Sequence, residues 1–103
     1  MTRKIEQALV AAIREGRHFS SGNTRYNHTV GGVFLHENPI ARVSLDGQGW
    51  EFSLAGWNTP TTRSRINALL DAFSPGRRVF TRNGTPFVSS NGQTASLHST
   101  EWF

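Results

Sequence analysis

Closely spaced turn signals between residues 30 and 97 limit how this chain can fold more than any other feature of its sequence. Gly, Asn, Asp and Pro recur there and separate short apolar segments. Such segments suit strands joined by tight turns, because a parallel crossover needs about a dozen residues or more. The sequence therefore predicts an α+β fold with a mainly antiparallel sheet.

Strands are predicted in the segments between these turns. Their ranges are residues 30–35, 40–45, 50–55, 78–82, 87–89 and 94–97. Gly31 and Gly32 interrupt the first strand, which indicates a bulge or a close approach of the backbone. Asn83-Gly84 is typical of a type I′ hairpin turn, although Pro86 disturbs the strand that follows. Residues 17–29 show no regular period, and a loop or an irregular edge segment is predicted there.

Two segments carry the apolar period of an amphipathic helix. In residues 2–15, Thr2 can cap the start and Gly16 can end the helix in the left-handed conformation. The second helix is predicted to begin at about Thr59 or Pro60, since proline suits the first helical position, and to end before residues 74–76. We expect the N-terminal helix and the central helix to pack on one face of five to six short strands. Seven Phe and three Trp are expected to dominate the core.

The length and composition of the chain predict a single domain over residues 1–103. The sequence has no cysteine, so disulfides and thiolate metal sites are excluded. Residues 1–16 lack the apolar run of a signal peptide, and no stretch approaches the roughly 18 apolar residues of a membrane span. A cytoplasmic location is therefore expected.

A strong preference for arginine marks this chain, whose net charge is +4. Ten of its eleven basic residues are arginine, and Lys4 is the exception. Residues 1–51 hold six basic and five acidic groups, whereas residues 52–103 hold five arginines and two acids, so the second half carries most of the positive charge. Guanidinium groups suit phosphate, carboxylate and base faces. A GC-rich genome would produce the same bias.

The start of the central helix is the first candidate site. The free amides of a helix start attract anions, and acidic residues usually occupy the first turn. Here that turn is free of acids and offers Thr59, Thr61 and Thr62, followed by Arg63 and Arg65. These residues predict a site for phosphate or carboxylate. In the alternative, the threonines only cap the helix and an arginine pairs with an acid such as Glu51 or Asp71.

The strand after the central helix is the second candidate. Arg78, Phe80 and Arg82 should project from one face of it, and Arg77 precedes them. Arginines interleaved with an aromatic ring predict a stacking platform for single-stranded nucleic acid or a nucleotide. In the alternative, Phe80 belongs to the core and the arginines only face solvent.

A third candidate is the polar segment of residues 22–28, which carries Arg25 and Tyr26. Binding residues are often found in loops, and a loop is predicted there. Arg25 therefore joins the candidate anion-binding residues.

Catalytic signals are absent from the sequence. The four histidines are scattered without metal-ligand spacing, and no phosphate-binding, nucleophile or dinucleotide motif occurs. The seven carboxylates form no obvious pair in the sequence. We therefore expect a non-enzymatic protein without cofactor or metal.

Three stretches of the sequence form a recognisable pattern. They are Gly22-Asn23-Thr24-Arg25, Val33-Phe34-Leu35-His36-Glu37-Asn38-Pro39-Ile40-Ala41 and Gly56-Trp57-x-Thr59-x-Thr61-Thr62-Arg63-x-Arg65-Ile66-Asn67-Ala68-Leu69-Leu70. The pattern covers about residues 22–90 and resembles that of a family of small uncharacterised bacteriophage proteins. The resemblance implies a phage or prophage accessory protein in the host cytoplasm, and it assigns no functional residues. Products of this class often block host defences such as CRISPR–Cas or nucleotide signalling.

The sequence thus favours a non-catalytic phage-type protein that docks nucleic acid or a host nucleoprotein through its second-half arginines. One alternative is an inhibitor, comparable to an anti-CRISPR protein, that occludes a host defence protein through apolar contacts. Another is a sponge that sequesters a signalling nucleotide at the start of the central helix. Partner identity and oligomeric state do not follow from the sequence.

Overall fold

The computed structural model describes residues 3–103, and within them the chain forms two helices and eight strands. The bounds, in chain order, are α1 Lys4–Glu15, β1 Phe19–Ser21, β2 Thr24–Asn27, β3 Gly32–Leu35, β4 Asn38–Val43, β5 Trp50–Phe52, α2 Pro60–Phe73, β6 Arg77–Arg82, β7 Thr85–Ser90 and β8 Gln93–Ser96. The α+β class and the N-terminal and central helices are as predicted. The proposed cap Thr2 lies outside the described residues.

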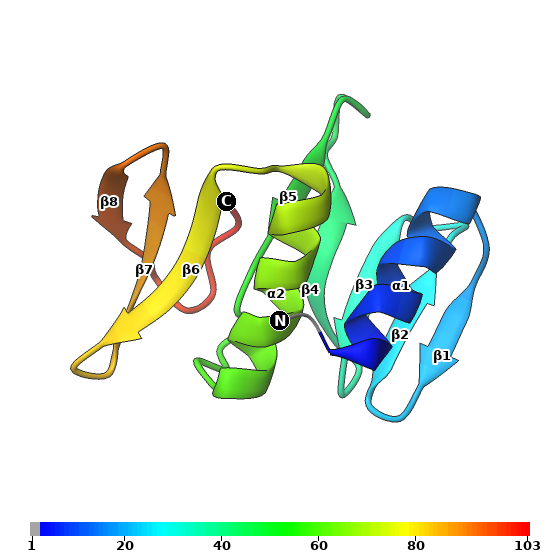
Figure 1. Cartoon of the computed structure of the whole chain (residues 1–103), viewed down its shortest axis with the longest axis horizontal. Helices are drawn as coiled ribbons and strands as arrows, with labels where there is room; N and C mark the ends of the chain where they lie inside the picture. Colours follow the sequence, from blue (N-terminus) through cyan, green and yellow to red (C-terminus); the bar gives the residue numbers. More distant parts are fainter. Residues whose placement is uncertain (1–2) are drawn as a thin grey trace.

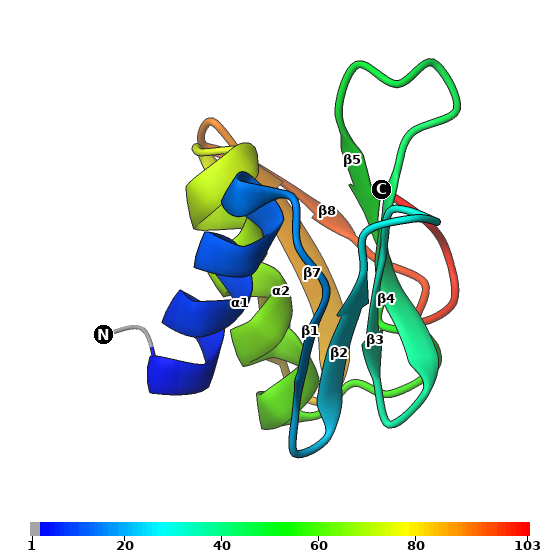
Figure 2. The ribbon, with the colours of Figure 1, turned by 90° about the vertical axis from the view of Figure 1, so that its right-hand side faces the viewer.

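The strands form two antiparallel sheets (Figure 1). In one, β1 to β5 follow each other in chain order, and in the other β6, β7 and β8 do the same. Both helices lie on the same side of the five-stranded sheet, as Figure 2 shows. Phe103 exchanges two backbone hydrogen bonds with Phe52, each 2.8 Å from N to O, so the C-terminal segment lies against β5.

The hairpin β1–β2 falls in the stretch predicted as a loop or an irregular edge segment. The loop is wrong, because the stretch forms two paired strands, of which β1 is the edge strand of the sheet. Phe19 pairs with Tyr26, and Ser21 pairs with Thr24. The side chains that β2 buries are Thr24 and Tyr26, so the inner face carries a polar residue and an aromatic hydroxyl. Because neither is a simple apolar residue, the alternation that usually reveals a strand is weak here. This hairpin adds two strands to the five to six predicted, and the resulting eight strands form two sheets.

One aliphatic core joins the two sheets and both helices. Its fully buried members include Leu9 of α1, Phe52 of β5, Leu69 of α2 and Val79 of β6. Tyr26 and Phe52 are the aromatic members of this core among the described residues, and the others are aliphatic. The expectation that aromatic residues dominate the core is therefore wrong. Most Phe and Trp side chains lie at partly exposed positions instead.

A buried polar network connects α1, α2 and β2. The Arg65 guanidinium donates to Oε2 of Glu6 at 2.6 Å and to Oγ1 of Thr24 at 3.0 Å. Ser64 donates to the same Glu6 oxygen at 2.7 Å, and the backbone N–H of Arg3 donates to the other at 3.2 Å. Glu6 is 2% exposed and Arg65 4%. Buried charges need this degree of pairing, because an unpaired one is very costly.

Replacing Arg65 with Ala is expected to reduce the free energy of unfolding by about 3–5 kcal/mol, since it leaves the Glu6 carboxylate buried without its cation. The matched control is Arg78→Ala, because the Arg78 side chain is exposed and makes no ion pair or hydrogen bond among residues 3–103. That change should stay within about 0.5 kcal/mol. Urea unfolding of the two variants measures the difference. Equal stabilities would contradict the role given to Arg65.

The ionisation of Glu6 predicts how stability depends on pH. Burial raises the pKa of Glu6, but hydrogen bonds from Ser64, Arg65 and the Arg3 backbone together lower it below the ordinary 4.5. A carboxyl whose pKa is lower in the folded state adds stability above its unfolded pKa and loses it as the pH falls through the folded value. The free energy of unfolding should therefore decrease as the pH falls below about 4.5, and this decrease should be less steep in Glu6→Gln. Glu15→Gln, at an exposed position, should keep the wild-type dependence of stability on pH. The same dependence in Glu6→Gln would contradict the assignment of this effect to Glu6.

Candidate nucleic-acid interface

Strand β6 turns alternate side chains to opposite faces. Val79 is 1% exposed and enters the core, while the Asn67 side chain on α2 accepts from its N–H at 2.7 Å and donates to its C=O at 2.9 Å. This pairing fixes which face of β6 points inward. Arg78, Phe80 and Arg82 alternate with Val79 and therefore share the other face, as predicted.

A stacked pair of phenylalanines occupies that face. Phe80 lies opposite Phe87 of β7 in the strand register, with ring centroids 5.6 Å apart and ring planes 17° from parallel. Both rings are partly exposed, and neither belongs to the hydrophobic core cluster. The guanidinium carbon of Arg82 lies 5.6 Å from the Phe80 centroid and 5.9 Å from that of Phe87. The alternative that Phe80 belongs to the core is therefore wrong.

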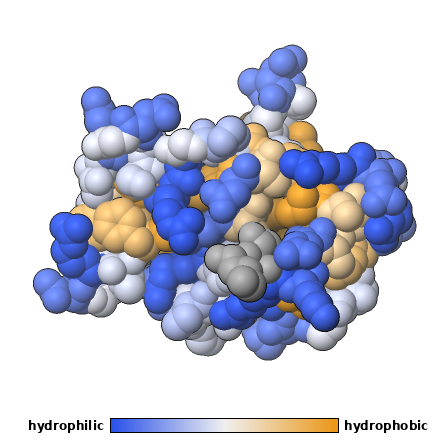
Figure 3. All heavy atoms as spheres, in the orientation of Figure 1, coloured by the Kyte–Doolittle hydropathy of each residue, from blue (hydrophilic) through white to orange (hydrophobic). Residues whose placement is uncertain are grey.

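We call Arg78, Phe80, Arg82 and Phe87 together the platform. Figure 3 shows pale orange atoms on the part of the surface formed by the three-stranded sheet, with hydrophilic atoms around them. Phe87 was not among the predicted site residues, although a signal for it was present. A two-residue turn at Asn83-Gly84 places Phe87 directly opposite Phe80, and both turn residues have the positive φ of a type I′ turn, 53° and 79°.

A groove of about 390 Å³ lies between α2 and the two platform residues Arg78 and Phe80 of β6. Arg63, Ser64 and Asp71 line it from the helix, and Arg78 and Phe80 line it from β6. The structure thus brings the predicted residues Arg63, Arg78 and Phe80 around one space. Arg63 and Arg78 supply positive charge, Asp71 opposes it, and the Glu6 carboxylate at the groove is already held by Arg65.

Asn58 connects the groove to the hairpin that carries the platform. Its backbone carbonyl accepts from Arg63 Nη1 at 3.1 Å, and its side-chain oxygen accepts from the same nitrogen. Its amide nitrogen donates to Thr81 Oγ1 at 3.1 Å and to the carbonyl of Gly84 at 3.4 Å. Through these bonds one side chain positions both the Arg63 guanidinium and the β6–β7 turn.

Most of the donors predicted to form an anion site at the start of α2 are used within the chain, and Thr61 is the exception among residues 3–103. Thr59 Oγ1 accepts from the backbone N–H of Thr62 at 3.2 Å and lies 2.9 Å from its hydroxyl. Thr62 is 2% exposed, and Arg65 is committed to Glu6. Including Thr62 and Arg65 in a ligand site is therefore a wrong prediction. The alternative with capping threonines and an ion-paired arginine describes this region better, except that the acid is Glu6. Thr61 lines a separate pocket.

Two further predicted arginines lie away from the platform. Arg77 belongs to the opposite face of β6, with its guanidinium 5.3 Å from the ring centroid of Phe103. Arg25 lies on β2 in the other sheet, where it donates to Glu37 at 2.8 Å and stands 4.4 Å from the ring centroid of Phe34. The structure therefore does not bring Arg25 or Arg77 together with Arg78 and Arg82.

The bridge at Asn58 predicts a coupled effect on stability and on the groove. Asn58→Ala should lower the free energy of unfolding by about 0.5–1.5 kcal/mol, because the Arg63 guanidinium and the β6–β7 turn each lose a hydrogen bond to its side chain. Gln48→Ala is the control, since Gln48 is exposed in the β4–β5 loop. The Nη–H signals of Arg63 in an NMR spectrum should also shift in Asn58→Ala alone. Wild-type stability and unshifted Arg63 signals would contradict the bridge.

Comparisons with known proteins place the chain in a family. No curated protein and no solved structure matches it. Within residues 3–103, neither helix is long and apolar enough to cross a membrane. The family model described as Kyanoviridae Gp96 protein matches residues 2–103, and so extends beyond the part of the chain that carries the resemblance to phage proteins. The chain belongs to the Kyanoviridae Gp96 protein family, a family of phage proteins.

Proposed function

We propose that this phage protein is a non-catalytic binding module that holds single-stranded nucleic acid, free or within a host nucleoprotein, in the infected cell. The observation that carries the proposal is the Phe80–Phe87 stack, which lies outside the core and has the Arg82 guanidinium beside both rings. Phe19, Phe73 and Phe103 are also partly exposed, but they pack against the core, whereas Phe80 and Phe87 do not.

The platform suits the two parts of a nucleotide. An exposed aromatic face stacks on a base, and such contacts contribute about 1–3 kcal/mol per base by alanine substitution. Every base has a flat face, so this recognition tolerates different sequences. The Arg78 guanidinium is free to approach a phosphate because the side chain makes no ion pair or hydrogen bond within residues 3–103. Arg63 lines the same groove from α2 and adds a second donor group.

Charge supports the same partner. Residues 52–103, which contain α2 and the three-stranded sheet, carry five arginines and only Asp71 and Glu101 as acids. A positive field of this kind attracts polyanions and makes the affinity fall as salt rises. Asp71 lines one part of the groove. We expect phosphates to pass along Arg78 and Arg82 rather than beside that carboxylate.

A host defence protein is the second candidate partner. Leu45 is 103% exposed and Val43 38% exposed, and both lie near the end of the β4–β5 hairpin, which projects from the molecule in Figure 2. Exposed apolar side chains at a projecting turn favour contact with a protein. A complex formed there should survive moderate salt, because it does not depend on screened charges.

Single-stranded binding predicts a measurable loss of affinity when the platform is changed. With a fluorescent oligouridylate or oligothymidylate of about 12 nucleotides at about 50 mM salt, Phe80→Ala or Phe87→Ala should each weaken binding roughly 5- to 150-fold, as expected for one lost stacking contact. Arg78→Ala and Arg82→Ala should each reduce the slope of log affinity against log salt by about 0.7. Fluorescence anisotropy measures both.

Arg25→Ala is the matched control for the arginine variants, because Arg25 is a cation of the other sheet. Arg25→Ala should change the affinity and the salt slope much less than Arg78→Ala or Arg82→Ala does. Undetectable binding of both oligonucleotides by the wild-type protein at about 50 mM salt would exclude the proposal. Binding that Arg25→Ala weakens as much as Arg78→Ala would show general charge attraction in place of a platform.

A further inference from the structure

A second pocket lies on the other side of the α2 start. Its volume is about 580 Å³, and it is bounded by the β3–β4 turn, the segment that follows β5 and the first turn of α2. It shares no lining residue with the groove beside the platform. Pockets for small molecules commonly measure about 300–1,000 Å³ and combine apolar walls with a few polar groups.

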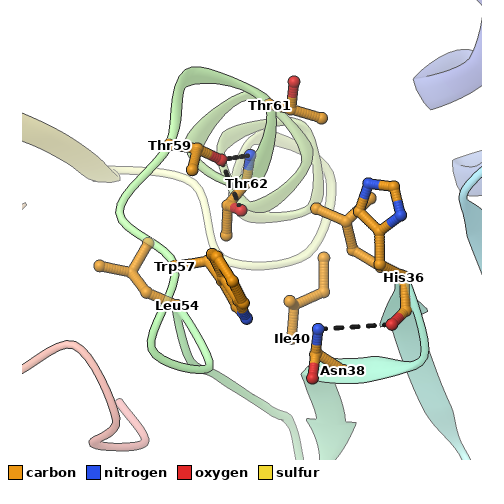
Figure 4. A pocket seen from close by; sticks show the side chains of 9 residues that line it. His36, Asn38, Ile40, Leu54, Trp57, Thr59, Thr61 and Thr62 are labelled. Atoms are coloured by element: carbon orange, nitrogen blue, oxygen red, sulfur yellow. Dashed lines mark hydrogen bonds between the residues drawn. The ribbon is translucent and has the colours of Figure 1, made fainter.

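The interior of this pocket is apolar. Leu35, Ile40 and Leu54 are 4%, 1% and 0% exposed and belong to the hydrophobic core. Trp57 stands at the opening with 58% of its surface exposed. In the close view of Figure 4, Trp57 and His36 lie on opposite sides of the opening, with Ile40 between them. A flat molecule that enters there would contact the indole on one side and buried aliphatic groups beneath.

The backbone that carries the exposed indole forms an ordered turn. Ala55 and Gly56 both adopt positive φ, 55° and 85°. Ser53 Oγ accepts from the backbone N–H of Ala55 at 3.0 Å, and the backbone N–H of Trp57 donates to the Leu54 carbonyl at 2.9 Å. Alanine seldom adopts this left-handed conformation, so the conformation depends on the hydrogen bonds that hold the turn. The turn thus fixes the backbone position of a large aromatic residue at the mouth of the pocket, which lowers the backbone entropy lost on binding.

The polar groups of the pocket are neutral or weakly basic. None of its lining residues is Asp, Glu, Lys or Arg. His36 lies in the β3–β4 turn and has a positive φ of 51°. Its ring Nε2 lies 3.5 Å from the amide nitrogen of Asn23. Asn38 holds its turn by donating to the His36 carbonyl at 3.4 Å. Its amide oxygen has no hydrogen bond within residues 3–103, and the Thr61 hydroxyl points away from Trp57 and Ile40 in Figure 4.

We propose that this pocket binds an uncharged, planar heteroaromatic molecule of nucleoside size, stacked on Trp57. The aromatic wall selects a flat ring, and the absence of charged lining residues disfavours a phosphorylated one. His36 and Asn38 supply hydrogen-bonding groups for the heteroatoms at the edge of the ring. This site is independent of the platform, so either can exist without the other.

Adenosine is the probe for the test. Titration into the full chain should shift the NMR signal of the Trp57 indole N–H, assigned with Trp57→Phe, and leave those of Trp50 and Trp102 unchanged. A ligand of this size on one stacking contact should saturate with a Kd of about 0.1–1 mM. Adenosine 5′-monophosphate should bind no more tightly than adenosine, and ribose should not bind.

Three variants make the site specific. Trp57→Ala removes the stacking wall at an exposed position and should weaken adenosine binding at least about tenfold, as measured from the backbone amide signals of His36, Asn38 and Thr61. His36→Asn keeps a residue that tolerates positive φ while removing the imidazole, and should weaken binding less. Phe87→Ala alters the platform and should leave adenosine binding unchanged. Circular dichroism confirms that each variant is folded.

Two results would overturn the proposal. One is the absence of any Trp57 shift with adenosine, guanosine, uridine and thymidine at about 5 mM, well above the expected Kd. The other is adenosine binding that persists in Trp57→Ala. Binding lost in Phe87→Ala but kept in Trp57→Ala would overturn this inference and support the platform as a base-binding surface, so the two proposals fail separately.

Discussion

The buried ion pair between Glu6 and Arg65 determines how the parts of this molecule meet. It joins the first helix to the second, and through Thr24 it reaches the strand that both helices cover. Such pairs seldom increase stability over an apolar core of the same volume, but they penalise every arrangement that leaves a charge unpaired. Here the penalty selects one packing of α1 against α2. The remaining features of α2, including the side that faces β6, follow from that orientation.

Helix α2 acts as the partition between two surfaces. Its Asn67 holds β6 by both backbone groups of Val79, and its start is tied through Asn58 to the β6–β7 turn. The three-stranded sheet is therefore attached to the helix by amide side chains as well as by apolar contact. Directional bonds of this type fix the rotation of a strand about its own axis. As a result one face of β6 is buried and the other keeps two stacked rings at the surface.

The sequence predicts the elements of this fold better than the partners of its charged groups. Periodicity found both helices, and turn pairs found the strands that carry apolar alternation. The search for apolar alternation missed β1 and β2, because the buried positions of β2 are Thr24 and Tyr26. The face shared by Arg78, Phe80 and Arg82 followed from strand geometry alone. The burial of Arg65 could not be predicted in the same way, because its partner Glu6 is 59 residues away in the chain. Helical spacing places Arg65 only at the border of the apolar face of α2.

The Asn83-Gly84 turn has a consequence for how this surface can vary. Strand pairing has a period of two, so the insertion or deletion of one residue in the turn would move Phe87 away from Phe80 and rotate the ladder beyond it by one position. Substitution of either ring by another aromatic residue would preserve the stack, whereas a change in turn length would not. The length of the connection is therefore under tighter constraint than the identity of the rings. By contrast, the projecting loop between β4 and β5 can change length while the ladders on either side keep their register.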